Sequence, residues 1–154
     1  MPNYNTIVLI LDECIEHYKE LLSFENEKIG YITSNNVSEL SNSLSREQAL
    51  IMKGNSLEAK RLAVLKKEGV GELRFSELIE QAPDGYSTLL NAKHSELSQY
   101  INEVKRINGF ALDMVKEKLS YIENRISQNQ TDTYDKSGEK KHKATSGSTI
   151  FKNV

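Results

Sequence analysis

The scarcity of helix breakers constrains this chain more than any other feature of its sequence. Its 154 residues include only two prolines, Pro2 and Pro83. Proline removes a backbone hydrogen bond and ends most helices, so a chain with so few favours long uninterrupted helices. The length fits one domain of ordinary size. Apolar residues make up 38 % of the chain, below the usual globular share of about 45–50 %. This composition allows a narrow apolar seam rather than a thick multilayer core.

The first helix is predicted over residues 5–34. Alternate steps of three and four residues from Val8 to Ile32 meet apolar or aromatic side chains at every position except Glu25, which describes a seam along one helical face. Further apolar residues beside this seam widen it, namely Ile7, Ile10, Leu21 and Phe24. A seam of that width suits a helix that touches two others.

The segment Thr33–Asn36 is predicted to break the chain, because its polar side chains compete for backbone hydrogen bonds. A second helix follows over residues 37–68, with a looser stripe in which Gly54 costs about 1 kcal/mol. A short helix is predicted over residues 74–81 and the longest one over residues 86–128. At about 1.5 Å per residue the last helix would reach about 60 Å. One of its ends must therefore project beyond its partners.

These elements predict an all-α fold, an elongated antiparallel bundle of three long helices, because short connections make successive helices run in opposite directions. The bundle is assigned to residues 1–129 and a flexible polar tail to residues 130–154. The tail is rich in Lys, Ser and Thr, and such a composition buries too little surface to offset its ordering entropy.

Charge and hydropathy exclude several classes of function. The formal net charge of −2 is too small to indicate nucleic acid or an anionic membrane as a partner. No stretch approaches the ~20 apolar residues of a membrane span, and the N-terminus does not resemble a signal peptide. We therefore expect a cytoplasmic protein without stable membrane insertion. The single cysteine, Cys14, excludes an internal disulfide and is expected to be a buried thiol.

The sequence also lacks the residue patterns of a reaction centre. His17 is expected at the surface or boundary of the bundle, and His94 partly buried in the seam. Glu13 and His17 alone are too few ligands for a metal site, and no glycine-rich loop follows a strand to hold a phosphate. We expect no enzyme, no metal and no cofactor.

The order of features resembles the FlgN family of flagellar export chaperones over almost the whole chain. The first helix carries EHYKELLSFENEKIGYI and ends in a polar break, and the second, VSELSNSLSREQALIMKGNSLEAKRLAVLKKEG, ends in glycine. The longest predicted helix, residues 86–128, contains RINGFALDMVKEKLSYI with the step Asn108-Gly109. The segment TYDKSGEKK is similar to the Tyr-x-x-x-Gly that opens the family's tail. Glu117, Lys118 and Gly54 depart from the pattern and leave the register of a binding groove open.

This resemblance implies a cytosolic chaperone of flagellar type III secretion. Its clients would be the hook-associated proteins of the hook–filament junction, whose C-terminal amphipathic helix it would hold by helix-in-groove recognition. It would prevent their aggregation and deliver them to the export gate, and the resemblance assigns Tyr134 a part in that second contact.

The projecting end of the longest helix is the predicted client-binding surface. We expect an exposed apolar stripe there, formed by Met114, Leu119, Ile122 and Ile126. The alternative is a structural or adaptor coiled-coil protein that self-associates through the same seams, and a homodimer stays open under either hypothesis.

Overall fold

The computed structural model of the chain describes the backbone of residues 1–137 and the side chains of residues 1–129. All regular structure in this range is helical: α1 (Tyr4–Thr33), α2 (Val37–Lys67), α3 (Phe75–Gln81) and α4 (Asp84–Ser137). The all-α prediction is confirmed, with four helices in the bundle, three long and one short. None of the described helices has the combined length and apolar character needed to cross a membrane.

A three-residue turn between α1 and α2 folds the two helices into a hairpin. Asn35 takes a φ of 55°, a left-handed conformation that Asn tolerates better than most residues. Its N–H donates to the carbonyl of Ile32, and the N–H of Asn36 donates to that of Tyr31, the hydrogen-bond pattern of a Schellman motif. The Asn36 side chain then accepts from the N–H of Glu39 and caps α2.

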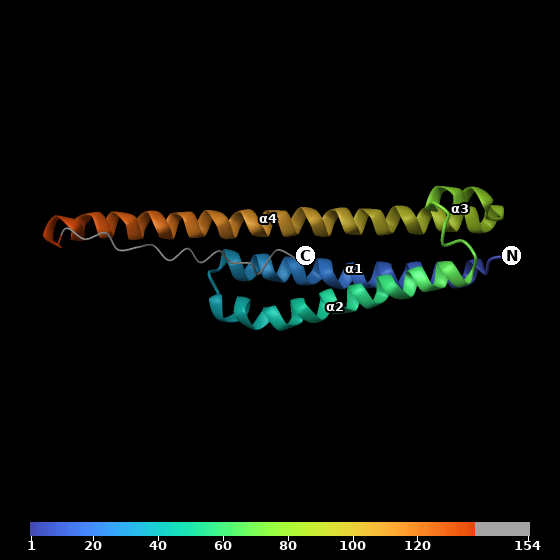
Figure 1. Cartoon of the computed structure of the whole chain (residues 1–154), viewed down its shortest axis with the longest axis horizontal. Coiled ribbons are helices and arrows are strands. Elements are labelled where there is room, and N and C mark those ends of the chain that lie inside the picture. Colours follow the sequence, from blue (N-terminus) through green and yellow to red (C-terminus); the bar gives the residue numbers. More distant parts are fainter. Residues whose placement is uncertain (138–154) are drawn as a thin grey trace.

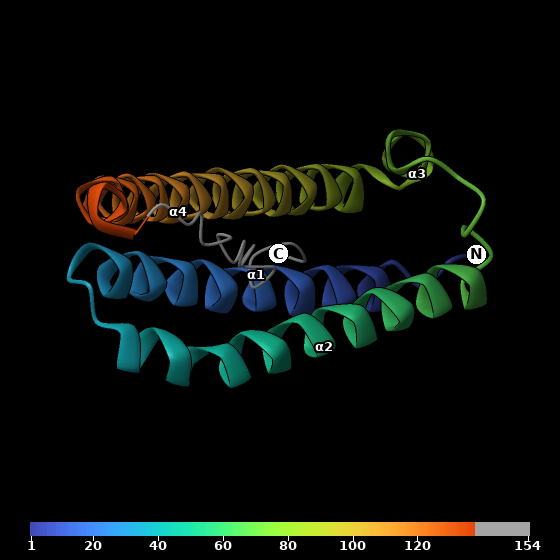
Figure 2. The same cartoon turned by 60° about the vertical axis from the view of Figure 1, so that its left-hand side comes forward.

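Helix α1 lies between the other two long helices. It packs against α2 on one side and α4 on the other, whereas the backbones of α2 and α4 do not approach each other anywhere in the described range. Figures 1 and 2 show this order, with α3 lying against the start of α4 near the N-terminus. The wide apolar seam predicted for the first helix is explained by its contact with two neighbours.

Helices α1 and α4 run parallel, as the first and third helices of an up–down–up bundle must, so the predicted alternation of successive long helices is kept. The Tyr86 hydroxyl donates to Asn5 Oδ1 at 2.9 Å, and Lys93 pairs with Asp12 at 2.7 Å. Both contacts join residues 81 positions apart in the same order. Successive long helices do alternate in direction, but α4 is the third of them and packs on the first. It is antiparallel to α2, whose backbone it does not approach in the described range.

The apolar core follows α1 as three clusters. The largest surrounds Ile7 and Leu90, both fully buried, and gathers α1, α3, the start of α4 and the loop after α2. A central cluster joins Leu21 and Phe24 to α2 and α4, and a third surrounds Ile32 near the hairpin turn. These clusters anchor α1 along its whole length.

Helix α4 is longer than predicted at both ends. It begins at Asp84 and continues to Ser137, beyond the predicted end near residue 128. No Pro or Gly lies between Ile126 and Ser137, so nothing in the backbone ends the helix where its apolar pattern fades. The 54 residues span about 80 Å. The predicted tail boundary at residue 130 therefore falls inside α4, and residues 138–154 lie outside the described part.

Candidate functional site

The C-terminal part of α4 extends past the α1–α2 hairpin. Lys118 Nζ donates a hydrogen bond to Asn35 Oδ1 in the hairpin turn, close to the level where α1 ends. Figure 1 shows the rest of α4 projecting beyond that turn. We call residues 119–137 the overhang, and at 1.5 Å per residue it is about 28 Å long. The prediction that one end of the longest helix projects is thereby confirmed.

The overhang carries an uncovered apolar stripe. Leu119, Ile122 and Ile126 follow one another at steps of three and four residues, so they share one helical face. Their side chains are 36 %, 51 % and 46 % exposed. A contiguous row of large aliphatic side chains open to water is uncommon on a soluble chain and is typical of a surface that binds something. We call these three residues the stripe.

Met114, the fourth residue predicted for this surface, has a different environment. It is half-buried and packs against the core cluster around Ile32. It also lines a hollow of about 530 Å³ at the junction of the hairpin turn and α4, together with Asn35, Tyr121 and Ile122. Met114 thus stands at the base of the stripe, where the core passes into the overhang.

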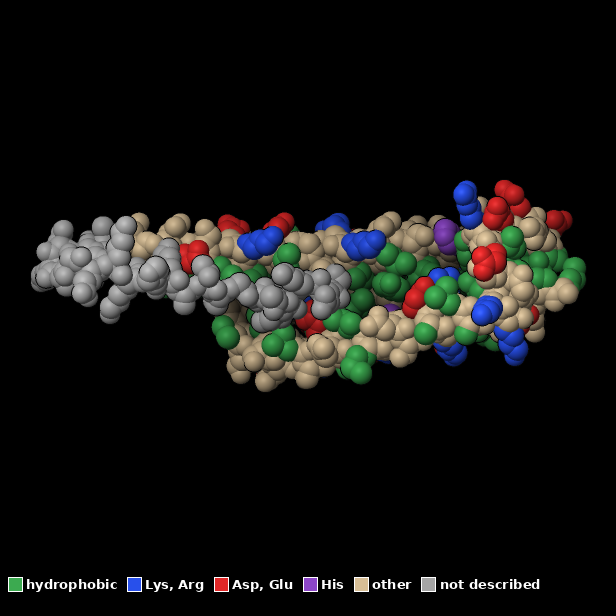
Figure 3. Space-filling model, in the orientation of Figure 1, with side chains coloured by type: hydrophobic (Ala, Val, Ile, Leu, Met, Phe, Trp, Pro, Cys, Tyr) green, Lys and Arg blue, Asp and Glu red, His purple; other side chains and the backbone are tan. Residues whose placement is uncertain are grey.

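A second uncovered apolar surface lies between α2 and α4. Since the backbones of these two helices stay apart, the floor of the gap is formed by α1. The resulting groove has a volume of about 350 Å³, and its edges carry Glu58 on α2 and Lys105 on α4. Figure 3 shows hydrophobic side chains gathered in the hollow between these two helices. The apolar residues that line it include Tyr18, Leu21, Ile51, Leu57, Ile101 and Val104. We call it the α2–α4 groove.

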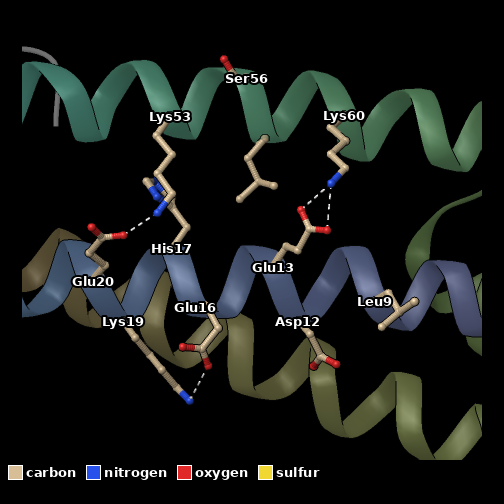
Figure 4. A pocket seen from close by; sticks show the side chains of 11 residues that line it. Leu9, Asp12, Glu13, Glu16, His17, Lys19, Glu20, Lys53, Ser56 and Lys60 are labelled. Carbon is tan, nitrogen blue, oxygen red and sulfur yellow. Dashed lines mark hydrogen bonds and ion pairs between the residues drawn. The ribbon is translucent and has the colours of Figure 1, made fainter.

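The opposite face of the α1–α2 hairpin is held by a ladder of ion pairs. Lys60 pairs with Glu13 at 2.7 Å, Lys53 with Glu20 at 2.5 Å and Arg46 with Glu27 at 2.8 Å. Both sets of residues recur every seventh position, so one side of α2 faces one side of α1 throughout. Figure 4 shows the first two pairs bridging the hollow between the helices, which has a volume of about 950 Å³. This hollow is bridged by the protein's own charges.

A charged cluster is buried in the same hairpin. Lys28 lies 2.8 Å from Glu25 and 3.2 Å from Glu47, and all three side chains are almost completely buried. Burial raises the pKa of Glu25, and the hydrogen bond from Lys28 opposes that rise. Two carboxylates share one ammonium group here, so the cluster carries excess negative charge while both acids are ionised.

Several titratable groups in the described part of the chain have environments that shift their pKa. Burial raises the pKa of the Cys14 thiol, which keeps it protonated and unreactive. His17 is buried rather than at the boundary, and desolvation and nearby Lys53 lower its pKa. His94 is exposed, and its ring stacks on that of Phe75 with 4.5 Å between the ring centroids. The predicted environments of both histidines were therefore wrong. Among the residues with described side chains, no group of three His, Cys, Asp or Glu could hold a metal ion.

Comparison with known protein families decides between the two hypotheses for the chain. A sequence model of the family described as FlgN protein matches residues 1–142. The chain belongs to the FlgN family. No curated protein and no solved structure matches it. The FlgN assignment places it among flagellar export chaperones rather than structural coiled coils, and a chaperone requires a binding surface rather than a reaction centre.

The sequence of this FlgN-family chain left two features open, the surroundings of Tyr134 and the α2–α4 groove. Tyr134 lies in the last turns of α4, and its side chain is outside the described residues. The α2–α4 groove was not predicted, because a one-dimensional pattern does not show which two helices fail to meet. The ion-pair ladder could have been found, since Glu13, Glu20 and Glu27 repeat at the same heptad interval as Arg46, Lys53 and Lys60.

Proposed function

We propose that this FlgN-family chaperone holds the C-terminal amphipathic helix of hook–filament junction proteins on the stripe of its overhang. The observation that carries the proposal is the exposed row Leu119, Ile122 and Ile126 on the part of α4 that projects beyond the α1–α2 hairpin. Client residues at i, i+3, i+4 and i+7 would fill this row, and flexible Met114 at its base would adapt to more than one client. Covering the client helix would prevent its aggregation.

Delivery to the export gate is the second half of the proposed function. The family resemblance gives Tyr134 a part in that contact, and its position in the last turns of α4 puts it on the same helix as the stripe. One helix would then present client and gate contact together. We propose that both steps take place in the cytoplasm. Tyr134→Ala should leave client binding intact and reduce secretion of the junction proteins.

The stripe is tested by adding charge to it. Leu119→Asp and Ile122→Asp together should lower affinity for a client C-terminal peptide at least tenfold, because an apolar contact cannot form over two carboxylates. The thermal midpoint of unfolding should change little, since both residues are exposed. The matched control places the same two charges elsewhere on the same helix, as Ser120→Asp with Asn124→Asp. Unchanged client binding in the stripe variant would show that the groove lies elsewhere, and global unfolding would show that the stripe is core.

A further inference from the structure

Two apolar surfaces of the described part of this molecule lack a partner, and they are similar in length. The overhang is a single helix with a stripe that nothing in the described structure covers. The α2–α4 groove is the open side of a bundle whose remaining contacts all run through α1 or α3. A free amphipathic helix is the kind of element that converts an open three-helix arrangement into a four-helix one. One chain carries both the helix and the place for it.

The stripe cannot reach the groove of its own chain, because a continuous helix carries it away from the bundle (Figure 1). We propose that the overhang of one copy lies in the α2–α4 groove of a second copy, and the reverse, in a symmetric dimer. This rests on the proposed function, for it assigns a client-free state to the same stripe. Reciprocal docking covers both stripes and closes the assembly, whereas one-way docking would leave an end open for further copies.

The dimensions of the two surfaces agree. The stripe runs from Leu119 to Ile126, a rise of about 10 Å. The groove floor runs along α1 from Cys14 to Leu21, also about 10 Å. Gly54 lines the α2 wall, and the space left by its missing side chain is occupied by the His17 ring. Apolar side chains on both surfaces would leave water on docking, the main favourable term in association.

Charges beside the two surfaces favour this occupant. Lys105 stands at the α4 edge of the groove, and no ion pair among the described side chains engages it. Glu123 follows Ile122 on one flank of the stripe and is likewise outside every described ion pair. The opposite groove edge carries Glu58, which also pairs with Arg61 at 2.7 Å, and the opposite flank of the stripe carries Arg125. In one orientation of the overhang in the groove, Glu123 would lie beside Lys105 and Arg125 beside Glu58, so opposite charges would meet at both edges of the groove.

The dimer would keep the stripe covered while no client is bound. A client helix and a second copy would compete for the same three side chains, so client binding would separate the dimer. Self-association would then protect the stripe from non-specific contacts until a client arrives. The groove, by contrast, would serve only the dimer and not the client. This asymmetry allows the two roles of the stripe to be separated by experiment.

Charge reversal on the full chain tests the docking without disturbing the core. Lys105→Glu and Glu123→Lys change exposed side chains, and each alone sets like charges together at both copies of the contact. Each variant should dimerise about three- to tenfold more weakly than the unmodified chain in sedimentation velocity. Mixing the two variants should give a heterodimer of restored affinity, and so should both reversals in one chain as a homodimer. A chain that stays monomeric up to about 1 mM, or dimerises equally in all these variants, overturns the inference.

A second pair of variants separates this inference from the proposed function. Ile51→Ser with Ile101→Ser removes apolar surface from half-exposed groove positions, and should abolish dimerisation while client-peptide binding persists. Leu119→Asp with Ile122→Asp should abolish both. If the stripe variant loses the dimer but keeps the client, the proposed client site fails and the dimer stands. If it loses the client while the unmodified chain never dimerises, the dimer fails and the client site stands. A dimer that survives in both variants also overturns the inference.

Discussion

Helix α1 has two neighbours, and it meets them by different chemistry. Toward α4 its seam is almost wholly aliphatic and aromatic, with Ile7 and Leu90 fully excluded from water. Toward α2 it meets a helix with only three buried residues, Ser43, Glu47 and Leu50. Only one of these is apolar. The α1–α4 seam is held by burial, whereas the α1–α2 seam is held largely by charge and shape.

The difference shows that a bundle does not need equal contributions from its helices. Burying apolar area stabilises by about 25 cal/mol per Å² and is little affected by salt, while exposed ion pairs contribute about 0–1 kcal/mol each and are screened. We expect α1 and α4 to set the global stability and α2 to open locally at lower cost. Four predictions test this comparison.

The largest effect is expected in the apolar seam. Leu90→Ala should reduce the free energy of unfolding by about 3–4 kcal/mol, because the cavity forms at a fully buried position. Urea unfolding followed by circular dichroism measures the change. The adjacent Leu89→Ala, at an exposed position, should cost less than about 1 kcal/mol. Equal losses in the two variants would contradict the assigned seam.

The next effect concerns Gly54, where α2 comes close to α1. A Cβ at this position would lie 2.8 Å from Nε2 of His17, a ring held in a buried site. Gly54→Ala should therefore destabilise by about 1–2 kcal/mol, despite the better helix propensity of alanine. Gly109→Ala, in open space on α4, is the control and should stabilise by up to about 1 kcal/mol. If both variants gain stability, α2 does not pack closely on His17.

A smaller effect of opposite sign is expected at Glu25. Burial raises the pKa of Glu25 in the folded state, so the folded chain loses stability as the pH rises through that pKa. Glu25→Gln removes the buried charge and leaves Lys28 paired with Glu47. The variant should gain about 1 kcal/mol near neutral pH, and the gain should vanish below about pH 4, where glutamate is protonated in both states. Glu47→Gln, which removes the cross-helix pair, should lose stability at neutral pH in the same urea titrations.

The smallest effect belongs to the ladder. Glu20→Gln removes one exposed rung, and should change the free energy of unfolding by at most about 0.5 kcal/mol. Hydrogen exchange should nevertheless quicken in α2 and stay unchanged around Leu90, because only the α1–α2 seam is weakened. In about 1 M salt the difference from the unmodified chain should disappear. A uniform change along the whole chain would mean that α2 and α4 open together.

Much of this fold could be predicted because helical periodicity is a local property. The bounds of α1 and α2 agree with the predictions within a residue, and α3 within a residue as well. Val104 is buried in the core, whereas Ile101, three residues earlier on α4, is only half-buried and lines the α2–α4 groove. The packing of α4 on α1 alone could not be predicted, because it depends on contacts between helices that are far apart in the sequence.

Single residues were misread where their role depends on a neighbour from another helix. Glu25 reads as an interruption of an apolar stripe, yet in three dimensions it joins a buried charge cluster. Gly54 reads as a weak point in a helix, yet its missing side chain admits His17. The stripe was accessible to sequence reasoning because it needs only a long helix and a shorter hairpin. The α2–α4 groove was not, because it depends on a contact that does not form.

The parallel course of α1 and α4 also determines the order in which the molecule is assembled. The rungs of the hairpin join residues 19, 33 and 47 positions apart, whereas Asn5 and Tyr86 are 81 apart. Closing short loops costs less entropy and is faster. During synthesis at about 5–20 residues per second, the hairpin is complete several seconds before the matching length of α4 has been made. We expect α1 to pack first against α2 during synthesis. The apolar face of α1 that contacts α4 in the folded chain would stay uncovered until α4 has been made.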